Sequence, residues 1–293
     1  MELSRKNNGS HFSAAKIKKR SHSTSRMVTF FLLLALFVSS FCYTLKVTIF
    51  SANQVSQTLT QDKYVKQLHS SLNDYLASLA KQYSIPTALT QNLLTNSQVK
   101  SDLKTAVENA YADKTAIFDT STIQSQVKTN LDAKAQSIGL STDNLIYQTA
   151  QSTLLSGLNG SLDQALNSQT LQQKVQQLNS AHKINSLILL VALGFSLLLL
   201  VLLIVVERNL FGWLHYLGVA AAYTAILLLA VSFLLKQIVA NLDFAQLSGQ
   251  ASIDLNDLAN SITQLVVSQA NQLMIVWLVV AVAGITVGFL RRR

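Results

Sequence analysis

The sequence has almost none of the residues that cross-link or break a chain. Its only cysteine, Cys42, lies inside an apolar run, so no internal disulfide can form. Its only proline, Pro86, lies outside the long apolar runs. Residues 51–183 also lack the alternating valine- and isoleucine-rich segments that strands require. This region is therefore expected to be helical and held together by packing alone.

Charged residues are scarce, at 13% of the chain against 49% hydrophobic residues, a balance typical of membrane proteins. The hydrophobic residues gather in four runs, each with about 18 or more residues, enough to cross a hydrocarbon core of roughly 30 Å as a helix. These runs are 27–45, 184–206, 214–235 and 273–290. The sequence thus predicts an all-α membrane protein with four transmembrane helices and an extracytoplasmic helical bundle.

The formal net charge of +9 comes from the two ends of the chain. Residues 1–26 hold seven basic side chains against one acid, whereas residues 51–183 hold ten lysines against nine acids. The chain ends in three arginines, 291–293. The positive-inside rule then predicts a multi-pass membrane protein with both termini in the cytoplasm. The lipid bilayer is the expected partner of these basic ends, and nucleic acid is not.

The charge pattern and the apolar runs divide the chain into eight predicted segments. They are a basic cytoplasmic tail (1–26), a first transmembrane helix (27–50), an extracytoplasmic helical domain (51–183), second and third transmembrane helices (184–206 and 214–236), an extracytoplasmic helical hairpin (237–271), a fourth transmembrane helix (272–290) and a cytoplasmic tail (291–293).

The segment around Cys42 could be a cleaved signal, a lipoprotein box or a retained span. A cleavage site needs small residues, but Phe41, Tyr43 and Leu45 occupy this segment. A lipobox has a small residue directly before its cysteine, where this chain has Phe41. We therefore expect an uncleaved signal anchor whose Lys46 extends its ammonium group to the outer interface.

Apolar residues recur at three- and four-residue spacing in the helical domain, which predicts about five helices. The first of these is expected to continue from the first span and to end before Pro86, and the last to run directly into the second span. The predicted buried positions are Val65, Leu68, Leu72, Leu76, Leu79 and Tyr83; Val99, Leu103, Val107 and Tyr111; Ile123, Val127, Leu131 and Ile138; Tyr147, Ala150, Leu154 and Leu158; and Leu171, Val175 and Leu178.

Polar residues and glycines predict where these helices begin and end. Ser97, Ser168 and the capping-box pair Ser121 and Gln124 are expected near helix starts, and Gly139 at a helix end. In residues 237–271 the same reasoning assigns a turn to Gly249 and a helix start to Ser252 and Asp254, followed by an apolar face that should pack on the helical domain. That face consists of Leu255, Leu258, Ile262 and Leu265.

The succession "YVKQLHSSLNDYL", "YSIPTAL", "VKSDLKTAVENAYADK" and "FDTSTIQ", between an amino-terminal span and further apolar helices, resembles a family of uncharacterised integral membrane proteins of Gram-positive bacteria. The resemblance covers roughly residues 62–124 and the order of the spans. It implies a bacterial plasma membrane and an extracytoplasmic helical domain, and it assigns no activity and no functional residue.

Motifs for catalysis or metal binding are few, and we nominate no catalytic, cofactor-binding or metal-ligating residue. None of the five histidines pairs with another at helical metal spacing, and no calcium-loop spacing joins the acids of the helical domain. The stretch SQVK, which formally matches S-x-x-K, occurs at Ser97 and at Ser125, but each resembles a helix start with an exposed lysine. The histidines are His11, His22, His69, His182 and His215; the acids are Asp62, Asp74, Asp102 and Asp113; the serines are Ser97 and Ser125.

The spans carry little that ion-coupled transport needs, since no ionisable residue lies near their centres and spans two to four contain no proline. A transport path would have to use Thr224, Ser232 and Thr286. Small residues favour close helix packing, and Gly284 and Gly288 could serve either packing within the chain or a homo-oligomer.

The favoured hypothesis is a noncatalytic membrane protein whose extracytoplasmic helical domain binds or senses an envelope component, a cell-wall partner or another protein. Mechanical coupling through helices shared by the domain and the spans would carry the signal. A transporter or channel subunit, or an envelope enzyme whose site is not readable from sequence, are the alternatives.

Overall fold

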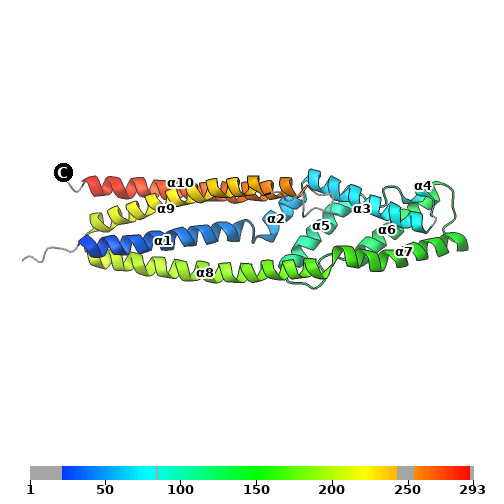
Figure 1. Ribbon diagram of the computed structural model, residues 1–293, viewed down its shortest axis with the longest axis horizontal. Coiled ribbons are helices and arrows are strands. Elements are labelled where there is room, and N and C mark those ends of the chain that lie inside the picture. Colours follow the sequence, from blue (N-terminus) through cyan, green and yellow to red (C-terminus); the bar gives the residue numbers. More distant parts are fainter. Residues whose placement is uncertain (1–21, 84, 243–253, 291–293) are drawn as a thin grey trace, which may run out of the picture.

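The computed structural model describes residues 22–83, 85–242 and 254–290, and this part of the chain is helical with no strand. Ten helices follow one another along it (Figure 1). They are α1 (His22–Val47), α2 (Ala52–Leu59), α3 (Asp62–Gln82), α4 (Thr87–Thr90), α5 (Asn96–Tyr111), α6 (Thr120–Ser137), α7 (Leu145–Leu166), α8 (Gln169–Glu207), α9 (Leu210–Asn241) and α10 (Leu255–Leu290).

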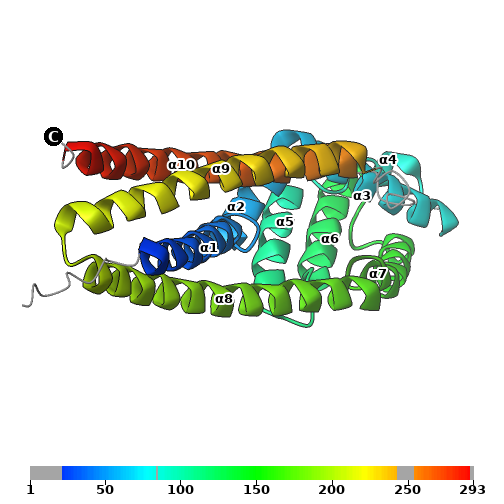
Figure 2. The ribbon, with the colours of Figure 1, turned by 60° about the vertical axis from the view of Figure 1, so that its left-hand side comes forward.

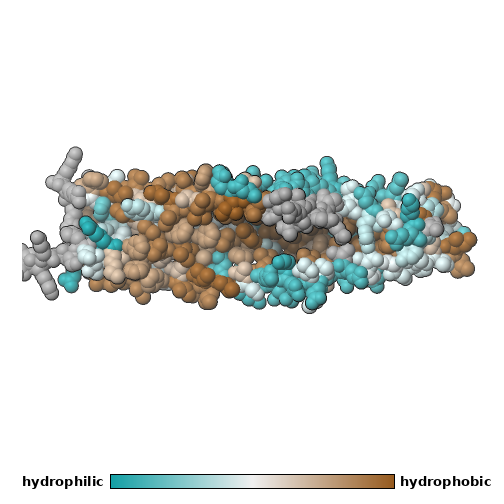
Figure 3. Space-filling model, in the orientation of Figure 1, coloured by the Kyte–Doolittle hydropathy of each residue, from teal (hydrophilic) through white to brown (hydrophobic). Residues whose placement is uncertain are grey.

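Four of these helices, α1, α8, α9 and α10, are long and apolar enough to cross a membrane, as the four apolar runs predicted. Side by side they form one end of an elongated molecule, which we call the spanning bundle (Figures 1 and 2). Helix α1 packs between α8 and α9, and α10 packs on α9. The surface of this end is largely hydrophobic, as an exterior in contact with lipid requires (Figure 3).

Glycines bring α9 and α10 into backbone contact. A Cβ atom added to Gly284 would lie 2.5 Å from the Leu214 carbonyl oxygen and 2.7 Å from the Cα of Gly218. A Cβ atom added to Gly288 would lie 2.5 Å from Nδ1 of His215. Both glycines of the predicted small-residue motif thus face α9 of the same chain. Their proposed use in a homo-oligomer stays a prediction.

Side-chain hydrogen bonds join helices inside the spanning bundle. Trp277 Nε1 of α10 donates to Ser40 Oγ of α1 at 2.8 Å, and Asn185 Nδ2 of α8 donates to the Cys42 carbonyl at 3.0 Å. Polar side chains link membrane helices in this way because hydrocarbon offers them no other partner. Cys42 itself is only 6% exposed within α1.

The other end of the molecule is the helical domain, formed by helices α2 to α7 with the first turns of α8, and its surface is mostly polar (Figure 3). Its main core gathers residues from α3, the loops around α4, α5, α6 and α7. The apolar periodicity predicted most of this core correctly: Val65, Leu76, Leu79, Val99, Ile123, Val127, Leu131, Tyr147, Leu154 and Leu158 are buried.

The predicted continuation of the first span into the next helix is wrong. Helix α1 ends before residues 48–51, and a second break follows at Thr60. At the first break the Ser51 side chain accepts the Gln54 N–H and caps α2. At the second, the Thr60 hydroxyl donates to a carbonyl of the preceding turn. Such side chains offer the backbone local partners other than the helical ladder, so α1 does not extend into α3.

Helix α8, in contrast, confirms the predicted continuity between the domain and the second span. It runs unbroken for 39 residues from a cap at Ser168, whose side chain accepts the Leu171 N–H, to Glu207. It therefore belongs to both ends of the molecule. Helix α10 similarly begins beside the helical domain and ends with the spanning bundle (Figure 1).

Two helix starts differ from the prediction. Helix α5 begins at Asn96, just before the predicted Ser97, because Thr95 and Gln98 form a reciprocal capping box. Helix α6 is capped by Asp119, whose carboxylate accepts the Thr122 N–H at 3.2 Å. Both caps precede the predicted serines by two residues. Gly139 follows the end of α6 with a φ of +79°, the left-handed conformation that a helix-ending glycine supplies.

Helix α10 contacts the helical domain through polar side chains. The packing of its apolar face on the domain stays a prediction. Lys63 Nζ on α3 lies 2.6 Å from Asp257 Oδ2 on α10, and the Tyr64 hydroxyl bonds Ser261 Oγ at 2.9 Å. Asp254 caps α10 by accepting the Asp257 N–H at 3.0 Å. The turn and helix start assigned to Gly249 and Ser252 lie outside the described residues.

Candidate functional site

The two SQVK stretches do not form nucleophile and base pairs. Ser125 Oγ donates to a backbone carbonyl of its own helix, and Lys128 lies 3.4 Å from the Asp132 carboxylate instead. Ser97 and Lys100 are both exposed at the start of α5. Each motif is therefore part of a solvated helix face.

The predicted acids and histidines are also dispersed. Within residues 22–83, 85–242 and 254–290 no three metal-binding side chains come together. Asp102 accepts from Gln126 at 3.0 Å, and Asp113 from Asn179 at 3.2 Å. The His182 ring stacks on Phe50 at 5.3 Å between centroids. These contacts join helices and assemble no ligand set.

The three polar residues of the spans do not share a path. Thr224 is fully buried and donates to the Ala220 carbonyl, whereas Thr286 is exposed on α10 and donates to carbonyls of its own helix. Ser232 is buried on α9. This arrangement gives no support to a polar route through the spanning bundle.

Glu207 is a buried carboxylate in the spanning bundle. It is 8% exposed at the end of α8 and accepts a hydrogen bond from Ser25 Oγ of α1. It also packs closely over Gly212 of α9, where a Cβ atom would lie 2.6 Å from Oε2. Glu207 thus joins three helices at the end of the spanning bundle where α1 begins.

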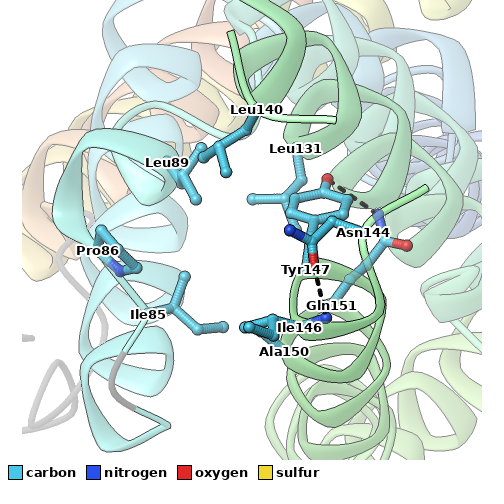
Figure 4. A pocket seen from close by; sticks show the side chains of 10 residues that line it. All are labelled: Ile85, Pro86, Leu89, Leu131, Leu140, Asn144, Ile146, Tyr147, Ala150 and Gln151. Atoms are coloured by element: carbon cyan, nitrogen blue, oxygen red, sulfur yellow. Dashed lines mark hydrogen bonds between the residues drawn. The ribbon is translucent and has the colours of Figure 1, made fainter. Parts of the chain in front are cut away.

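The helical domain contains an apolar pocket of about 290 Å³ between α4 and the start of α7. These two elements lie at the end of the molecule farthest from the spanning bundle (Figure 1). Figure 4 shows the side chains of the pocket converging on an open space, with the α3–α4 segment on one side and α7 on the other. We call it the distal pocket. It is lined by Ile85, Pro86, Leu89, Leu131, Leu140, Asn144, Ile146, Tyr147, Ala150 and Gln151.

Three local features place these residues around the pocket. Pro86, with a φ of −58°, starts the short α4 and presents Ile85 and Leu89 to the core, where both are nearly buried. The left-handed Gly139 turns the chain after α6. Asn144 then caps α7 by accepting the Ile146 N–H at 2.9 Å. The pocket therefore forms where two loops meet two helix starts.

One side of the pocket carries a closed polar network. The Tyr147 hydroxyl donates to Asp132 Oδ1 at 2.7 Å, and Gln151 Nε2 donates to the same oxygen at 2.6 Å. Burial raises the pKa of Asp132, but hydrogen bonds from Tyr147 and Gln151 and the charge of Lys128 outweigh it, so the pKa is lowered overall. The carboxylate therefore stays ionised at neutral pH.

Tyr147 is held in its neutral form by the same surroundings. Burial raises the pKa of its hydroxyl, and the hydrogen bond and negative charge of Asp132 raise it further. A general acid or base works best with a pKa near the operating pH, and both groups are shifted away from neutrality. The network can position the pocket wall, and it is poorly suited to proton transfer.

The rim of the pocket exposes large apolar side chains to solvent. Leu145 is 77% and Ile146 80% exposed at the start of α7, and Ile138 is 54% exposed at the end of α6. The apolar spacing predicted that Ile138 is buried, and this is wrong because the chain leaves the helix there. Together with Leu140, 37% exposed, these residues form the distal patch, a hydrophobic end visible in Figure 3.

A pocket next to such a patch is suited to bind an apolar group. Exposed apolar clusters are uncommon on soluble surfaces and mark binding sites when they adjoin a recess. Apolar spacing predicted that Tyr147 and Ala150 lie on the packed side of α7, but it did not identify Leu145 and Ile146. The sequence signal for these two residues is that large aliphatic side chains directly follow the helix cap Asn144.

Comparisons of the chain with protein-family models, with curated proteins and with solved structures found no match.

Proposed function

We propose that this chain is a noncatalytic plasma-membrane protein of a Gram-positive bacterium whose helical domain binds an envelope component or partner protein through the distal pocket. The observation that carries this proposal is the apolar pocket and its exposed aliphatic rim, Leu145 and Ile146 above all. Their position at the far end of the domain leaves them accessible to a partner away from the bilayer (Figure 1).

The charge pattern supports an extracytoplasmic position for the distal pocket. The basic residues of 1–26 lead into α1 and those of 291–293 follow α10, and these two helix ends lie at the same end of the spanning bundle (Figure 1). The positive-inside rule assigns that end to the cytoplasm. The helical domain then faces the envelope, and α1 is a retained signal anchor.

Helix α8 offers a route for coupling. Its first turns are held to α5, since Asn179 Nδ2 donates to the Ala110 carbonyl at 2.8 Å. Its last residue, Glu207, is held to α1 through Ser25. A movement of the helical domain on binding would therefore act on a rigid element that ends beside the cytoplasm. Coupling in this form needs α8 and not the first span, because α1 is separated from α3 by two breaks.

Site-specific photo-crosslinking in cells tests the proposed function. A photoreactive amino acid at Ile146 should capture a discrete envelope component, identified by mass spectrometry. The matched control is Thr153, which is exposed on the same helix seven residues later and thus about 10 Å away on the same face. Capture at Ile146 and not at Thr153 is the expected result.

The variant Ile146→Ser provides a second measurement. It removes an 80% exposed side chain, so the fold should remain intact while capture by a probe at neighbouring Leu145 weakens. Equal crosslinking at Ile146 and Thr153, or no discrete product at either position, would contradict the proposed use of the distal pocket.

A further inference from the structure

Two grooves of equal volume, about 450 Å³ each, lie on the spanning bundle on either side of α1. The first, between α1 and α9, is lined by side chains that include Arg26, Phe30, Val219 and Tyr223. The second, between α1 and α8, is lined only by apolar residues such as Phe31 and Val191. In a bilayer, acyl chains are the default filling of such apolar recesses. The two grooves differ in charge, because Arg26 places a cationic side chain in the lining of the first and the second has no charged side chain.

Arg26 lies near the start of α1, so its guanidinium marks the end of the α1–α9 groove next to the membrane surface. Phe30 and Leu33 follow on the next turns of the same face and carry the apolar lining over about 10 Å along the helix axis. Tyr216 and Tyr223 of α9 add two aromatic side chains to the opposite wall. The groove is therefore cationic at one end and apolar along its length.

The guanidinium of Arg26 is free to accept a ligand. Arg26 is exposed, and in the part of the chain that the structure describes it forms no ion pair or hydrogen bond. The adjacent carboxylate, Glu207, is turned toward Ser25 on the buried side of α1. Thr29, also in the lining, already donates to the Ser25 carbonyl at 2.7 Å. The free guanidinium of Arg26 therefore suits an anionic ligand at this end of the groove.

We propose that the α1–α9 groove binds one anionic phospholipid, with the phosphate at Arg26 and an acyl chain along Phe30, Leu33 and Val219. Charge complementarity supports this occupant, because Arg26 lies at the start of the groove and belongs to a segment, 1–26, that holds seven basic residues. Basic recesses between membrane helices on the cytoplasmic side are typical sites for anionic headgroups. The α1–α8 groove, without a cation, takes an acyl chain and does not discriminate between headgroups.

Native mass spectrometry of the full chain in detergent, titrated with phosphatidylglycerol and phosphatidylcholine of identical acyl chains, measures this selectivity. One basic residue near a lipid surface strengthens the binding of an anionic headgroup, and this gain in binding free energy corresponds to about fivefold higher affinity. We therefore expect the chain to retain phosphatidylglycerol about fivefold more than phosphatidylcholine. Arg26→Gln should abolish most of that preference. Lys46→Gln, which removes one exposed charge at the other end of α1, should leave it unchanged.

Filling either groove with a larger side chain distinguishes a lipid bound in the α1–α9 groove from a general attraction between the basic residues and anionic lipids. Val219→Phe fills the α1–α9 groove and keeps Arg26, and it should lower phosphatidylglycerol retention. Val191→Phe adds the same bulk to the α1–α8 groove and should not change the headgroup preference. If Val219→Phe impairs folding, photoreactive phosphatidylglycerol provides the second measurement, with adducts expected at Phe30 or Tyr223 and not at Phe31.

Three results would overturn the proposal. They are equal retention of the two lipids by the unmodified chain, an unchanged preference in Arg26→Gln, and adducts spread evenly over both grooves. An unchanged preference would instead assign the selectivity to the other basic residues of 1–26. The helical domain and its distal pocket take no part in these measurements, so their outcome is independent of the proposed function.

Discussion

Asn73 on α3 and Leu94, in the loop after α4, exchange two hydrogen bonds. Asn73 Nδ2 donates to the Leu94 carbonyl at 3.1 Å, and the Leu94 N–H donates to Asn73 Oδ1 at 2.9 Å. Both residues are buried, at 5% and 1% exposure. One amide side chain thus satisfies both backbone groups of a residue in a loop that would otherwise bury them unpaired, and it fixes the segment that carries Leu89 of the distal pocket.

Replacing Asn73 by alanine should destabilise the helical domain strongly. The change leaves a buried N–H and a buried carbonyl of Leu94 without partners, at a cost of about 2–4 kcal/mol in the free energy of unfolding. Urea unfolding followed by circular dichroism measures the loss. The control Asn53→Ala alters an exposed residue of α2 whose side chain bonds only Gln57, and it should have little effect. Equal stability of both variants would contradict the role of the Asn73 amide.

Gly284→Ala should separate α9 from α10. The new methyl group would meet the Leu214 carbonyl and the Gly218 Cα, backbone atoms that cannot move aside, so overpacking should cost about 1–3 kcal/mol. The matched control is Gly194→Ala on α8, where nothing lies within 4 Å of the added atom. Spin-label distances between α9 and α10 should lengthen in the first variant and stay constant in the second. Unchanged distances in Gly284→Ala would contradict the backbone contact.

The Asp132 network predicts a pH dependence at the acidic side. The pKa of Asp132 is lowered in the folded chain, so its stabilising effect is present above the ordinary value of 3.8 and is lost as the pH falls through the folded pKa. Asp132→Asn should therefore melt below the unmodified chain at neutral pH, and the difference should shrink below pH 3.8. Thermal melts between acidic and neutral pH measure this convergence.

Asp143→Asn is the control for that titration. Asp143 lies in the nearby loop before α7, and its carboxylate has no hydrogen bond within the described residues. Its replacement should leave the pH dependence of melting intact. A constant difference between Asp132→Asn and the unmodified chain at all pH values would show that the ionised carboxylate is not the stabilising species.

Cys42 should react with a maleimide reagent only after denaturation, because it is buried between α1 and α8 and its carbonyl is bonded to Asn185. In a Cys42→Ser background, Lys46→Cys gives the matched control, since residue 46 is exposed on the same helix and should react without denaturant. A mature protein whose measured mass shows that it begins at a lipid-modified Cys42 would contradict the proposed retained signal anchor.

The periodicity of apolar residues predicted the helices and most of the core. The buried residues of a helix lie on one face, so they recur at three- and four-residue spacing along the sequence. The periodicity also predicted the continuity of α8. It failed where local hydrogen bonding competes with the helix, at the breaks that separate α1 from α3, and where a helix ends, at Ile138.

The sequence by itself determined that the protein is helical and has four apolar runs long enough to span a membrane, since hydrophobic length is a local property that needs no partner. Only the tertiary structure decided which residues meet. The distal pocket joins the α3–α4 segment to α7, and the α1–α9 groove joins Arg26 to Tyr223, residues far apart in the chain. Whether a large apolar side chain such as Ile146 is covered or exposed depends on how two loops fold back on a helix start, and local spacing holds no information about that packing.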